Sequence, residues 1–500
     1  MDNRLILALD QGTTGSTALL VTPELEVIAR ANVEFPQIYP KPGWVEHDPE
    51  AIYDSQLKAI EMVLAQCPDA DSRIAAIGIT NQRETTLLWD KNTNKSIYNA
   101  IVWQCRRTSA TCDTLKAEGK EAIFRERTGL VLDAYFSGTK VTWLLDNVEG
   151  AREKAERGEL AFGTVDSFLI WRLTEGARHV TDTTNASRTL LFNIHEKKWD
   201  DTLLDILRCP KSILPEVASS SEVYGTTLNV PGLRDGIPIA GIAGDQQSAL
   251  FGQACFSPGD LKCTYGTGAF LLQNIGTKPL PSSQGLLTTI AWTIGDETHY
   301  ALEGSVFIAG AAVQWIRDGL ELVDAAPDIE ALAGTVESSD GVTIVPAFVG
   351  LGAPYWDADA RGAIYGITRG THRGHFARAT LEAIALSCQD LARAIEKDSG
   401  KPVKALKVDG GAAQNDLMMQ IQSDLLNADI IRPTQLETTA LGAACLAGLA
   451  VGIFNSLDDI RSRWATEKTF TPNEGQSYTQ SLRKRWDAAI RCTREFANPE

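Results

Sequence analysis

The sequence predicts an α/β protein made of two similar halves. Each half begins with a strand–turn–strand hairpin whose tip is rich in glycine and threonine, at residues 5–22 and again at 260–274. Apolar strand-like runs alternate with helix-like segments along the rest of the chain, which is typical of an α/β architecture. A chain of 500 residues is also too long for a single core. We therefore expect two duplicated domains, residues 1–253 and 254–500.

The other elements follow from local signals. Asp48 and Pro49 are typical of a helix start, and apolar residues recur at helical spacing after them. Glycine-rich or small-residue segments mark the ends of several strands, where helices are expected to begin. The expected elements are a strand at 74–80, a strand leading into a helix at 162–174, a strand at 403–411 followed by a helix, and a helix of small residues at 438–452.

Composition excludes several function classes. The chain is 44% apolar and 22% charged, with a net charge of −17 and only short basic runs, which argues against nucleic acid as a partner. No stretch approaches the roughly 20 apolar residues that span a bilayer. The nine cysteines are an odd number without a C-x-x-C pair, which fits free thiols in a reducing cytoplasm. We expect a cytoplasmic protein that does not insert into a membrane.

The hairpin tips are candidate phosphate-binding turns. Residues 12–15 (GTTG) offer consecutive backbone N–H groups and hydroxyls without bulk, and such turns bind anions. One turn of this kind is more often a plain hairpin turn. A second tip at Gly266–Thr267 indicates a polyphosphate held from both sides, and a nucleotide is the natural candidate. The sequence has neither a P-loop nor a dinucleotide-binding glycine motif.

Two carboxylates lie at the ends of apolar strands. Asp10 ends the first strand, where a carboxylate is costly unless it meets water or a cation, and Mg²⁺ held largely through water suits it. Hydrogen bonding to the turn is the structural alternative. Asp245 follows the apolar run 237–240, and a strand end is a rigid place for catalytic chemistry. The alternative is that Asp245 caps the next helix.

Arg83 and Glu84 come just after the strand at 74–80. Arginine supplies fixed donors and glutamate supplies acceptors, a combination that suits a small neutral polyol. A structural salt bridge between them is the alternative. Trp103 and Phe270 would supply apolar walls for the carbon face of such a ligand, although core packing is the default for both residues.

These segments resemble the glycerol kinases of the FGGY carbohydrate-kinase family, within the actin/hexokinase/Hsp70-like superfamily. The segments NQRET, WQCRRT and GDQQSALFGQ resemble glycerol kinases in particular, whereas 140–143 and 362–382 match general family signatures. The matching segments are LDQGTTGS (9–16), YPKPGWVEHDP (39–49), GITNQRET (78–85), IVWQCRRT (101–108), YFSGTKVTWLLDN (135–147), TNASRTLLFNIH (184–195), GIAGDQQSALFGQ (241–253), TYGTGAF (264–270), GLGAPYWDADARGAIYGITRG (350–370), VDGGAAQND (408–416) and TALGAACLAGLAVG (439–452).

The resemblance implies two actin-like (ribonuclease H-like) domains with a catalytic cleft between them. It implies ATP- and Mg²⁺-dependent phosphorylation of glycerol to sn-glycerol 3-phosphate, with glycerol and phosphates on the side of residues 1–253 and the nucleotide on the side of 254–500. Asp245 would be the general base, and Asp10 and Asp245 would serve the metal. We also expect a homo-oligomer, a dimer or a tetramer. The glycerol-binding residues would be Arg83, Glu84, Trp103, Tyr135, Asp245, Gln246 and Phe270, and the nucleotide-binding residues Thr13, Thr14, Gly15, Thr267, Gly310, Gln314, Gly411 and Asn415.

The sequence departs from the family in several places. Thr17 stands where many members carry an arginine that reaches nucleotide phosphates, and Gly15 replaces a frequent serine. In the loop at 231–236, Arg234–Asp235–Gly236 differs from the Gly-x-Arg that binds fructose 1,6-bisphosphate in some bacterial members. Residues 471–478 also differ from the acidic stretch that docks a phosphotransferase protein there. The displaced basic group in the loop at 231–236 argues against feedback inhibition by fructose 1,6-bisphosphate.

Two alternative functions remain at this point. The first is an FGGY kinase for another small polyol or a ketose, which would share the fold and the nucleotide side. The second is an actin- or chaperone-like nucleotide switch, which would hydrolyse ATP without a polyol. Because one fold serves many functions, only the site residues separate these alternatives.

Overall fold

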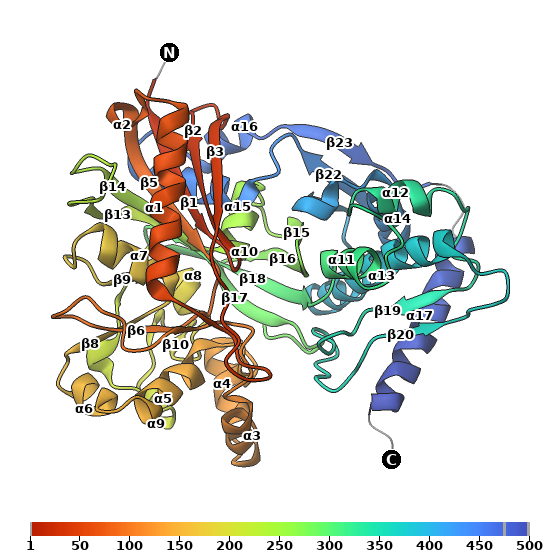
Figure 1. Ribbon diagram of the computed structural model, residues 1–500, viewed down its shortest axis with the longest axis horizontal. Coiled ribbons are helices and arrows are strands. Elements are labelled where there is room, and N and C mark those ends of the chain that lie inside the picture. Colours follow the sequence, from red (N-terminus) through yellow and green to blue (C-terminus); the bar gives the residue numbers. More distant parts are fainter. Residues whose placement is uncertain (1–2, 474–476, 498–500) are drawn as a thin grey trace.

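The computed structural model describes residues 3–473 and 477–497. Two mixed sheets form the centres of two halves, the N-terminal half coloured red to yellow-green and the C-terminal half green to blue in Figure 1. The six-stranded sheet of the N-terminal half has the order β13-β14-β5-β1-β2-β3. Its strands are β1 (Leu5–Gln11), β2 (Gly15–Val21), β3 (Val27–Glu34), β5 (Ile74–Asn81), β13 (Ser221–Thr226) and β14 (Pro238–Gly244).

The seven-stranded sheet of the C-terminal half has the order β17-β18-β16-β15-β21-β22-β23. It repeats the plan of the first sheet, because a hairpin and a third antiparallel strand are followed by two strands parallel to the first. Its strands are β15 (Leu261–Tyr265), β16 (Ala269–Gly276), β17 (Leu287–Ile294), β18 (Glu297–Val306), β21 (Ala405–Asp409), β22 (Asp429–Pro433) and β23 (Thr466–Phe470). The predicted duplication is therefore confirmed at the level of topology. The division at residue 253 stays a prediction.

Both predicted hairpins form, and a backbone hydrogen bond closes each tip, across residues 12–15 in the first and 266–268 in the second. Gly12 N–H donates to Gly15 O at 2.9 Å in the first tip, and Gly266 N–H donates to Gly268 O at 2.9 Å in the second. Each tip therefore lies between the first and second strands of its sheet, which places the two candidate phosphate turns at equivalent positions of the two halves.

Two helices connect the halves. Helix α10 (Asp245–Gly252) follows β14, and α15 (Thr438–Ala450) lies against the N-terminal sheet although it comes late in the chain. In Figure 1 the blue α15 lies among the red and orange strands. Glycines permit these contacts: a Cβ at Gly442 would collide with the backbone of Ser248 in α10, and a Cβ at Gly78 with that of Ala443 in α15. The small residues of α15 thus allow the close packing that the sequence predicted.

The remaining predicted elements are also present. Asp48 Oδ1 accepts a hydrogen bond from Glu50 N–H at 3.0 Å and caps α1 (Pro49–Gln66), as expected. The predicted strand and helix at 162–174 are β8 (Leu160–Gly163) and α7 (Val165–Leu173), and the helix after β21 is α14 (Asp416–Leu426). The other elements are β4 (Glu46–His47), α2 (Ala70–Arg73), β6 (Leu87–Asp90), β7 (Ala100–Ile101), α3 (Ser109–Ala117), α4 (Glu121–Thr128), α5 (Ser137–Asn147), α6 (Ala151–Glu156), β9 (Val180–Asp182), α8 (Thr183–Ala186), β10 (Phe192–Asn193), β11 (Lys198–Trp199), α9 (Asp201–Ile206), η1 (Lys211–Ile213), β12 (Glu216–Ala218), α11 (Gly310–Asp318), α12 (Asp328–Ala333), β19 (Thr343–Val345), β20 (Ala363–Tyr365), α13 (Arg373–Ser399), η2 (Gly411–Gln414), α16 (Leu457–Arg463) and α17 (Ser477–Ala497).

All nine cysteines lie in the described part of the chain and are free thiols, as their number and spacing predicted. Among the helices of residues 3–473 and 477–497, none is both long enough and apolar enough to cross a membrane.

Candidate functional site

The predicted site residues of the N-terminal half lie where its parallel strands end. Asp10 is the penultimate residue of β1, Arg83 and Glu84 follow β5, and Asp245 follows β14. Strands β1, β5 and β14 are parallel neighbours in the sheet. Because the carboxyl ends of parallel strands meet at one edge, these residues lie along the same edge of the sheet, where open α/β sheets bind their ligands.

Asp245 is the first residue of α10 and lies deep in the molecule, yet its side chain is 30% exposed. Its Oδ1 lies 3.1 Å from Arg83 Nε and accepts a hydrogen bond from Gln246 N–H at 2.7 Å. The N-cap of α10 is Gly244, so the alternative that Asp245 caps this helix is wrong. Burial raises the pKa of Asp245, while Arg83 and Lys262 oppose that rise. The carboxylate is therefore fixed at a strand end and accessible to a ligand.

Arg83 and Glu84 belong to a buried ionic cluster, which is completed by two residues to which the sequence assigned no role. Arg83 donates to both carboxylate oxygens of Glu303, at 2.5 and 2.9 Å. Arg188 donates to Glu84 at 2.6 Å and to Glu303 at 3.0 Å. Glu303 lies on β18, so the cluster joins the two halves next to Asp245. The direct pair between Arg83 and Glu84 is longer, at 3.8 Å, so their main ionic partners are Glu303 and Arg188.

The two carboxylates of this cluster, Glu303 and Glu84, differ in the number of hydrogen bonds that they accept from arginine. Burial by itself raises a carboxyl pKa. Glu303 accepts three guanidinium hydrogen bonds, so that, despite its burial, Arg188 and Arg83 hold its pKa at about 2. Glu84 accepts one such bond, and burial raises its pKa although Arg188 and Arg83 oppose the rise. Glu84 therefore keeps acceptor capacity for a ligand hydroxyl.

Lys140 and Ser137 fix the backbone around Glu84. Lys140 Nζ donates to Tyr135 O at 2.6 Å and to Glu84 O at 3.2 Å, and Ser137 Oγ donates to Glu84 O at 3.1 Å. Glu84 has a left-handed φ of 60°, a costly conformation for a non-glycine residue. Burial lowers the pKa of Lys140 to about 8. This family-signature lysine thus holds the backbone of two predicted glycerol-binding residues.

Of the three predicted aromatic residues, Trp103 contacts the first hairpin tip. Trp103 and Tyr135 form an edge-to-face pair with ring centroids 5.5 Å apart. Trp103 Nε1–H donates to Thr13 Oγ1 at 3.0 Å, and Gln37 Nε2–H donates to Thr13 O at 3.1 Å. Phe270, on β16, is half-buried and packs against the apolar core around α10 and α15. Trp103 and Tyr135 therefore lie together, whereas Phe270 comes from the other half.

The neighbouring turn residues differ in exposure. Thr14 is exposed, and Gly15 is buried as the first residue of β2. Thr17 pairs with Asp10 across β1 and β2, and its Oγ1 accepts a hydrogen bond from Asn32 Nδ2 at 2.9 Å. The Thr17 side chain is thus held within the sheet, where it cannot substitute for a long arginine that reaches a phosphate.

The predicted nucleotide residues of the C-terminal half fall into two groups. Gly310 begins α11 and donates its N–H to Gly266 O at 3.0 Å, which joins it to the turn that contains Thr267. Gln314 is exposed one turn further along α11. Gly411 follows β21 with open space at its Cα, and Asn415 caps α14 by accepting a hydrogen bond from Met418 N–H at 2.8 Å. Both groups follow strands of one sheet, and β15 and β21 are parallel neighbours.

Asp10 has the surroundings of a cation ligand. Burial, together with the nearby carboxylates of Asp245 and Glu437, raises its pKa to about 8, and Arg30 opposes this only in part. A divalent cation would relieve this concentration of negative charge. The residues present therefore fit Mg²⁺. The described residues contain no group of three or more His, Cys, Asp or Glu side chains arranged to hold a metal by themselves.

Four polar residues near the site were not predicted from the sequence, namely Arg188, Gln247, Lys262 and Glu303. Gln247 Oε1 accepts a hydrogen bond from Arg83 at 3.1 Å, and Lys262 Nζ donates to Gln246 Oε1 at 2.6 Å. A signal was present for two of them, because Lys262 and Glu303 are charged residues that directly follow a leucine within a strand.

Of the segments that depart from the family, the loop at 231–236 has local hydrogen-bond partners. Arg234 N–H donates to Asp71 Oδ1 at 3.0 Å, and the Arg234 guanidinium donates to Asp71 O and to Ile74 O at 3.1 and 2.6 Å. This guanidinium is thus engaged by its own chain. Of the segment 471–478, residues 474–476 lie outside the described residues.

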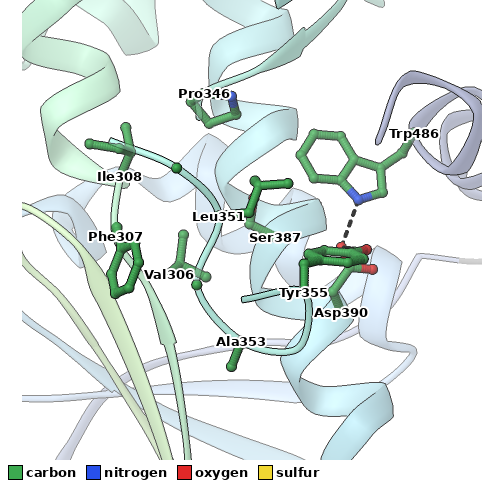
Figure 2. A pocket seen from close by; sticks show the side chains of 12 residues that line it. Val306, Phe307, Ile308, Pro346, Leu351, Ala353, Tyr355, Ser387, Asp390 and Trp486 are labelled. Atoms are coloured by element: carbon green, nitrogen blue, oxygen red, sulfur yellow. Dashed lines mark hydrogen bonds between the residues drawn. The ribbon is translucent and has the colours of Figure 1, made fainter. Parts of the chain in front are cut away.

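Two pockets elsewhere contain none of the predicted site residues. The pocket in Figure 2 has a volume of about 30 Å³, which is too small for glycerol or a nucleotide. In it, Tyr355 Oη and Trp486 Nε1 donate to Asp390 Oδ2 at 2.8 and 2.7 Å. The other, of about 780 Å³, lies by the N-terminus of α1 and is lined by residues that include Asp48, Asn94 and Arg172. Neither is a candidate for the site at the strand ends.

Comparisons with known proteins agree with this architecture. The model of the N-terminal domain of the FGGY family of carbohydrate kinases matches residues 5–252, and that of the C-terminal domain matches residues 261–451. The chain is 56% identical to a glycerol kinase of Geobacillus kaustophilus over 494 residues, which are 99% of this chain and 100% of the relative. It is 57% identical to a glycerol kinase of Caldanaerobacter subterraneus over 495 residues, 99% of each chain.

Solved structures show the same fold over the whole chain. A glycerol kinase of Plasmodium falciparum, crystallised with ADP, has a TM-score of 0.90 and 37% identity, and 98% of each chain is covered. A ligand-bound xylulose kinase of Lactobacillus acidophilus has a TM-score of 0.88 and 25% identity, and 99% of each chain is covered. The fold is thus shared by kinases that differ in the substrate they are named for.

Proposed function

The chain belongs to the FGGY family of carbohydrate kinases, and from this premise we propose that it phosphorylates glycerol with ATP to form sn-glycerol 3-phosphate. The observation that carries the proposal is the accessible carboxylate of Asp245, held by Arg83 at the end of β14 beside Glu84. Full-length identity above one half to glycerol kinases supports glycerol over the sugar substrates of more distant members.

In the proposed reaction, Asp245 acts as general base. Arg83, Glu84, Tyr135 and Gln246 hydrogen-bond the three hydroxyls, and Trp103 and Phe270 border the carbon chain. Asp245 accepts the proton of the terminal glycerol hydroxyl, and the hydroxyl oxygen attacks the γ-phosphorus of ATP in line. The bond between the γ-phosphorus and the oxygen that bridges it to the β-phosphate breaks, and ADP leaves. Such transfers depend mainly on positioning and charge stabilisation rather than on covalent chemistry of the protein.

The phosphates are proposed to lie between the two hairpin tips. Thr13, Thr14 and Gly15 would bind them from the N-terminal half and Thr267 from the C-terminal half, while Gly310, Gln314, Gly411 and Asn415 flank the nucleoside. Asp10 and Asp245 would hold Mg²⁺, which neutralises phosphate charge when bound. This assignment places the glycerol side in residues 1–253 and the nucleotide side in residues 254–500, with the catalytic site between them.

The test is ADP production from Mg·ATP with and without glycerol, and with xylulose, erythritol or dihydroxyacetone in its place. We expect ADP to form only when glycerol is present and in amounts equal to the glycerol phosphorylated. The kcat/KM for glycerol should exceed that for the other acceptors by up to about 10⁴-fold, because each of them loses or misplaces a hydroxyl that the site binds. Equal ADP release without any acceptor would indicate a nucleotide switch. Preference for a ketose would indicate another FGGY kinase.

The affinity for Mg²⁺ is expected to depend on pH through Asp10. Because its pKa is raised to about 8 in the metal-free protein, a cation must displace a proton below that pH. The apparent affinity should therefore fall by up to about tenfold for each unit below pH 8. The measurement is the rise in melting temperature caused by Mg²⁺ without nucleotide at pH 6, 7 and 8. An equal rise at all three values, or an unchanged pH dependence in Asp10→Asn, would contradict the assignment.

We further propose a cytoplasmic homo-oligomer. Nine free thiols and the absence of a spanning helix among the described residues support the location, and size-exclusion chromatography with light scattering tests the assembly. A monomer at micromolar concentration would contradict the oligomeric assignment.

A further inference from the structure

Lys262 is a buried cation at the point where the two halves meet. It lies on β15 of the C-terminal half and is fully buried. Its Nζ donates to Gln246 Oε1 at 2.6 Å and to Thr264 Oγ1 at 2.9 Å. Gln246 is the residue directly after the proposed base, and its Nε2 has no hydrogen-bond partner within residues 3–473 and 477–497. The contact therefore acts on a proposed glycerol-binding side chain.

A lysine at this position is costly in stability: burial lowers the pKa of Lys262, and the nearby carboxylates of Asp409 and Asp245 oppose this only in part. Burying an ammonium group is costly, and the N-terminal end of a helix carries partial positive charge that disfavours a cation. Lys407 is the neighbour of Lys262 in the parallel register of β21 and β15. It shows the favourable arrangement, because its Nζ donates to Gln253 O at the C-terminal end of α10, at 2.6 Å. A cation at the start of α10 thus indicates a requirement of the site.

We propose that Lys262 is a positioning residue, which turns the side-chain amide of Gln246 so that its NH₂ group, and not its carbonyl, faces glycerol. Lysine has three donors and no acceptor, so the amide oxygen must face Nζ. The amide nitrogen is then directed away from Lys262 and donates to a hydroxyl oxygen of the substrate. Glu84 accepts a hydrogen bond from a substrate hydroxyl, whereas Gln246 donates one to a hydroxyl oxygen. The two residues together therefore fix the direction of the hydrogen bonds to glycerol. This inference rests on the proposed glycerol kinase function.

The first test compares Lys262→Met with Lys407→Met in steady-state assays. Without Nζ, the Gln246 amide rotates freely, so the KM for glycerol should rise about tenfold, as expected when one oriented hydrogen bond is lost, while the KM for ATP stays within about twofold. Lys407→Met should keep the wild-type KM for glycerol. An equal rise for glycerol and ATP, or a Lys262→Met variant indistinguishable from Lys407→Met, would overturn the inference.

The second test is Gln246→Glu, which retains Lys262 and keeps an oxygen against Nζ but presents no donor to glycerol. We expect its KM for glycerol to rise at least as much as in Lys262→Met, and the double variant Lys262→Met with Gln246→Leu to be no worse than Gln246→Leu alone. A wild-type KM in Gln246→Glu would show that the carbonyl faces glycerol and would overturn the inference.

The two proposals fail in different ways. If the wild-type chain forms no ADP in response to glycerol, the proposed function fails. If the wild type responds to glycerol but both variants keep its KM, only the role of Lys262 fails.

Discussion

Asp245→Asn is expected to lower glycerol-dependent ADP production at least about a hundredfold, because a lost general base typically costs 10²–10⁴-fold in rate. Asparagine retains the size of the side chain and an oxygen facing Arg83, which keeps its bidentate contact with Glu303. Binding of glycerol and nucleotide should therefore change much less than kcat. Single-turnover ADP formation, with glycerol affinity measured by calorimetry, separates the two effects.

The matched control is Asp200→Asn. Asp200 is also an ion-paired carboxylate of the N-terminal half, 2.7 Å from Arg127, but it caps α9 and is not among the predicted site residues. Asparagine is an equally good N-cap, so this variant should keep nearly wild-type turnover. An Asp245→Asn variant with the activity of Asp200→Asn would exclude Asp245 as the base.

Glu303→Gln is expected to destabilise the protein by about 3–5 kcal/mol, the usual cost of removing one partner from a buried ion pair. Glutamine preserves volume, so the loss reflects the charges left on Arg83 and Arg188 and not a cavity. Urea unfolding followed by tryptophan fluorescence measures the change. Glu297→Gln, on the same strand but with a side chain 68% exposed, should shift stability by less than about 0.5 kcal/mol.

The same residue predicts a response to acid. The pKa of Glu303 is held at about 2 in the folded protein, below the ordinary 4.5 of the free side chain. A depressed carboxyl pKa adds stability above the unfolded value and loses it as pH falls through the folded value. The Glu303 contribution should therefore be complete above pH 5 and should disappear between about pH 4.5 and 2. The stability difference between wild type and Glu303→Gln should shrink over that interval, and a constant difference would contradict this account.

The repeated hairpins and most of their partner elements were predictable because local signals specify them. The glycine–threonine tips and the Asp48 cap each act within a few residues of chain, and the small residues of α15 form a continuous run that is visible in the sequence. Asp245, Arg83 and Glu84 were recognisable because they come within a few residues of the ends of apolar strands. Their position at one edge of the sheet follows from the parallel pairing of β1, β5 and β14, and this pairing could not be predicted from the sequence.

The ionic cluster was not predictable in the same way. Arg83 and Glu303 are 220 positions apart, and Arg188 contacts Glu303 across 115 positions. A contact of this length has no periodic or spacing signal, and the charge of Glu303 within a strand indicates only that some partner exists. The orientation of Gln246 is likewise set by Lys262, a residue from the other half.

The position of α15 has a consequence for how the chain folds during synthesis. The face of the N-terminal sheet formed by β1, β5 and β14 is covered by a helix that is not made until residues 438–450 have emerged. Until then that face stays open to water, and until β18 has also been made Arg83 and Arg188 lack Glu303. Contacts of such long range slow folding and leave apolar surface exposed to aggregation in the meantime. Residues 1–253, synthesised alone, should therefore not form a stable folded unit, even though they carry most of the proposed glycerol-binding residues.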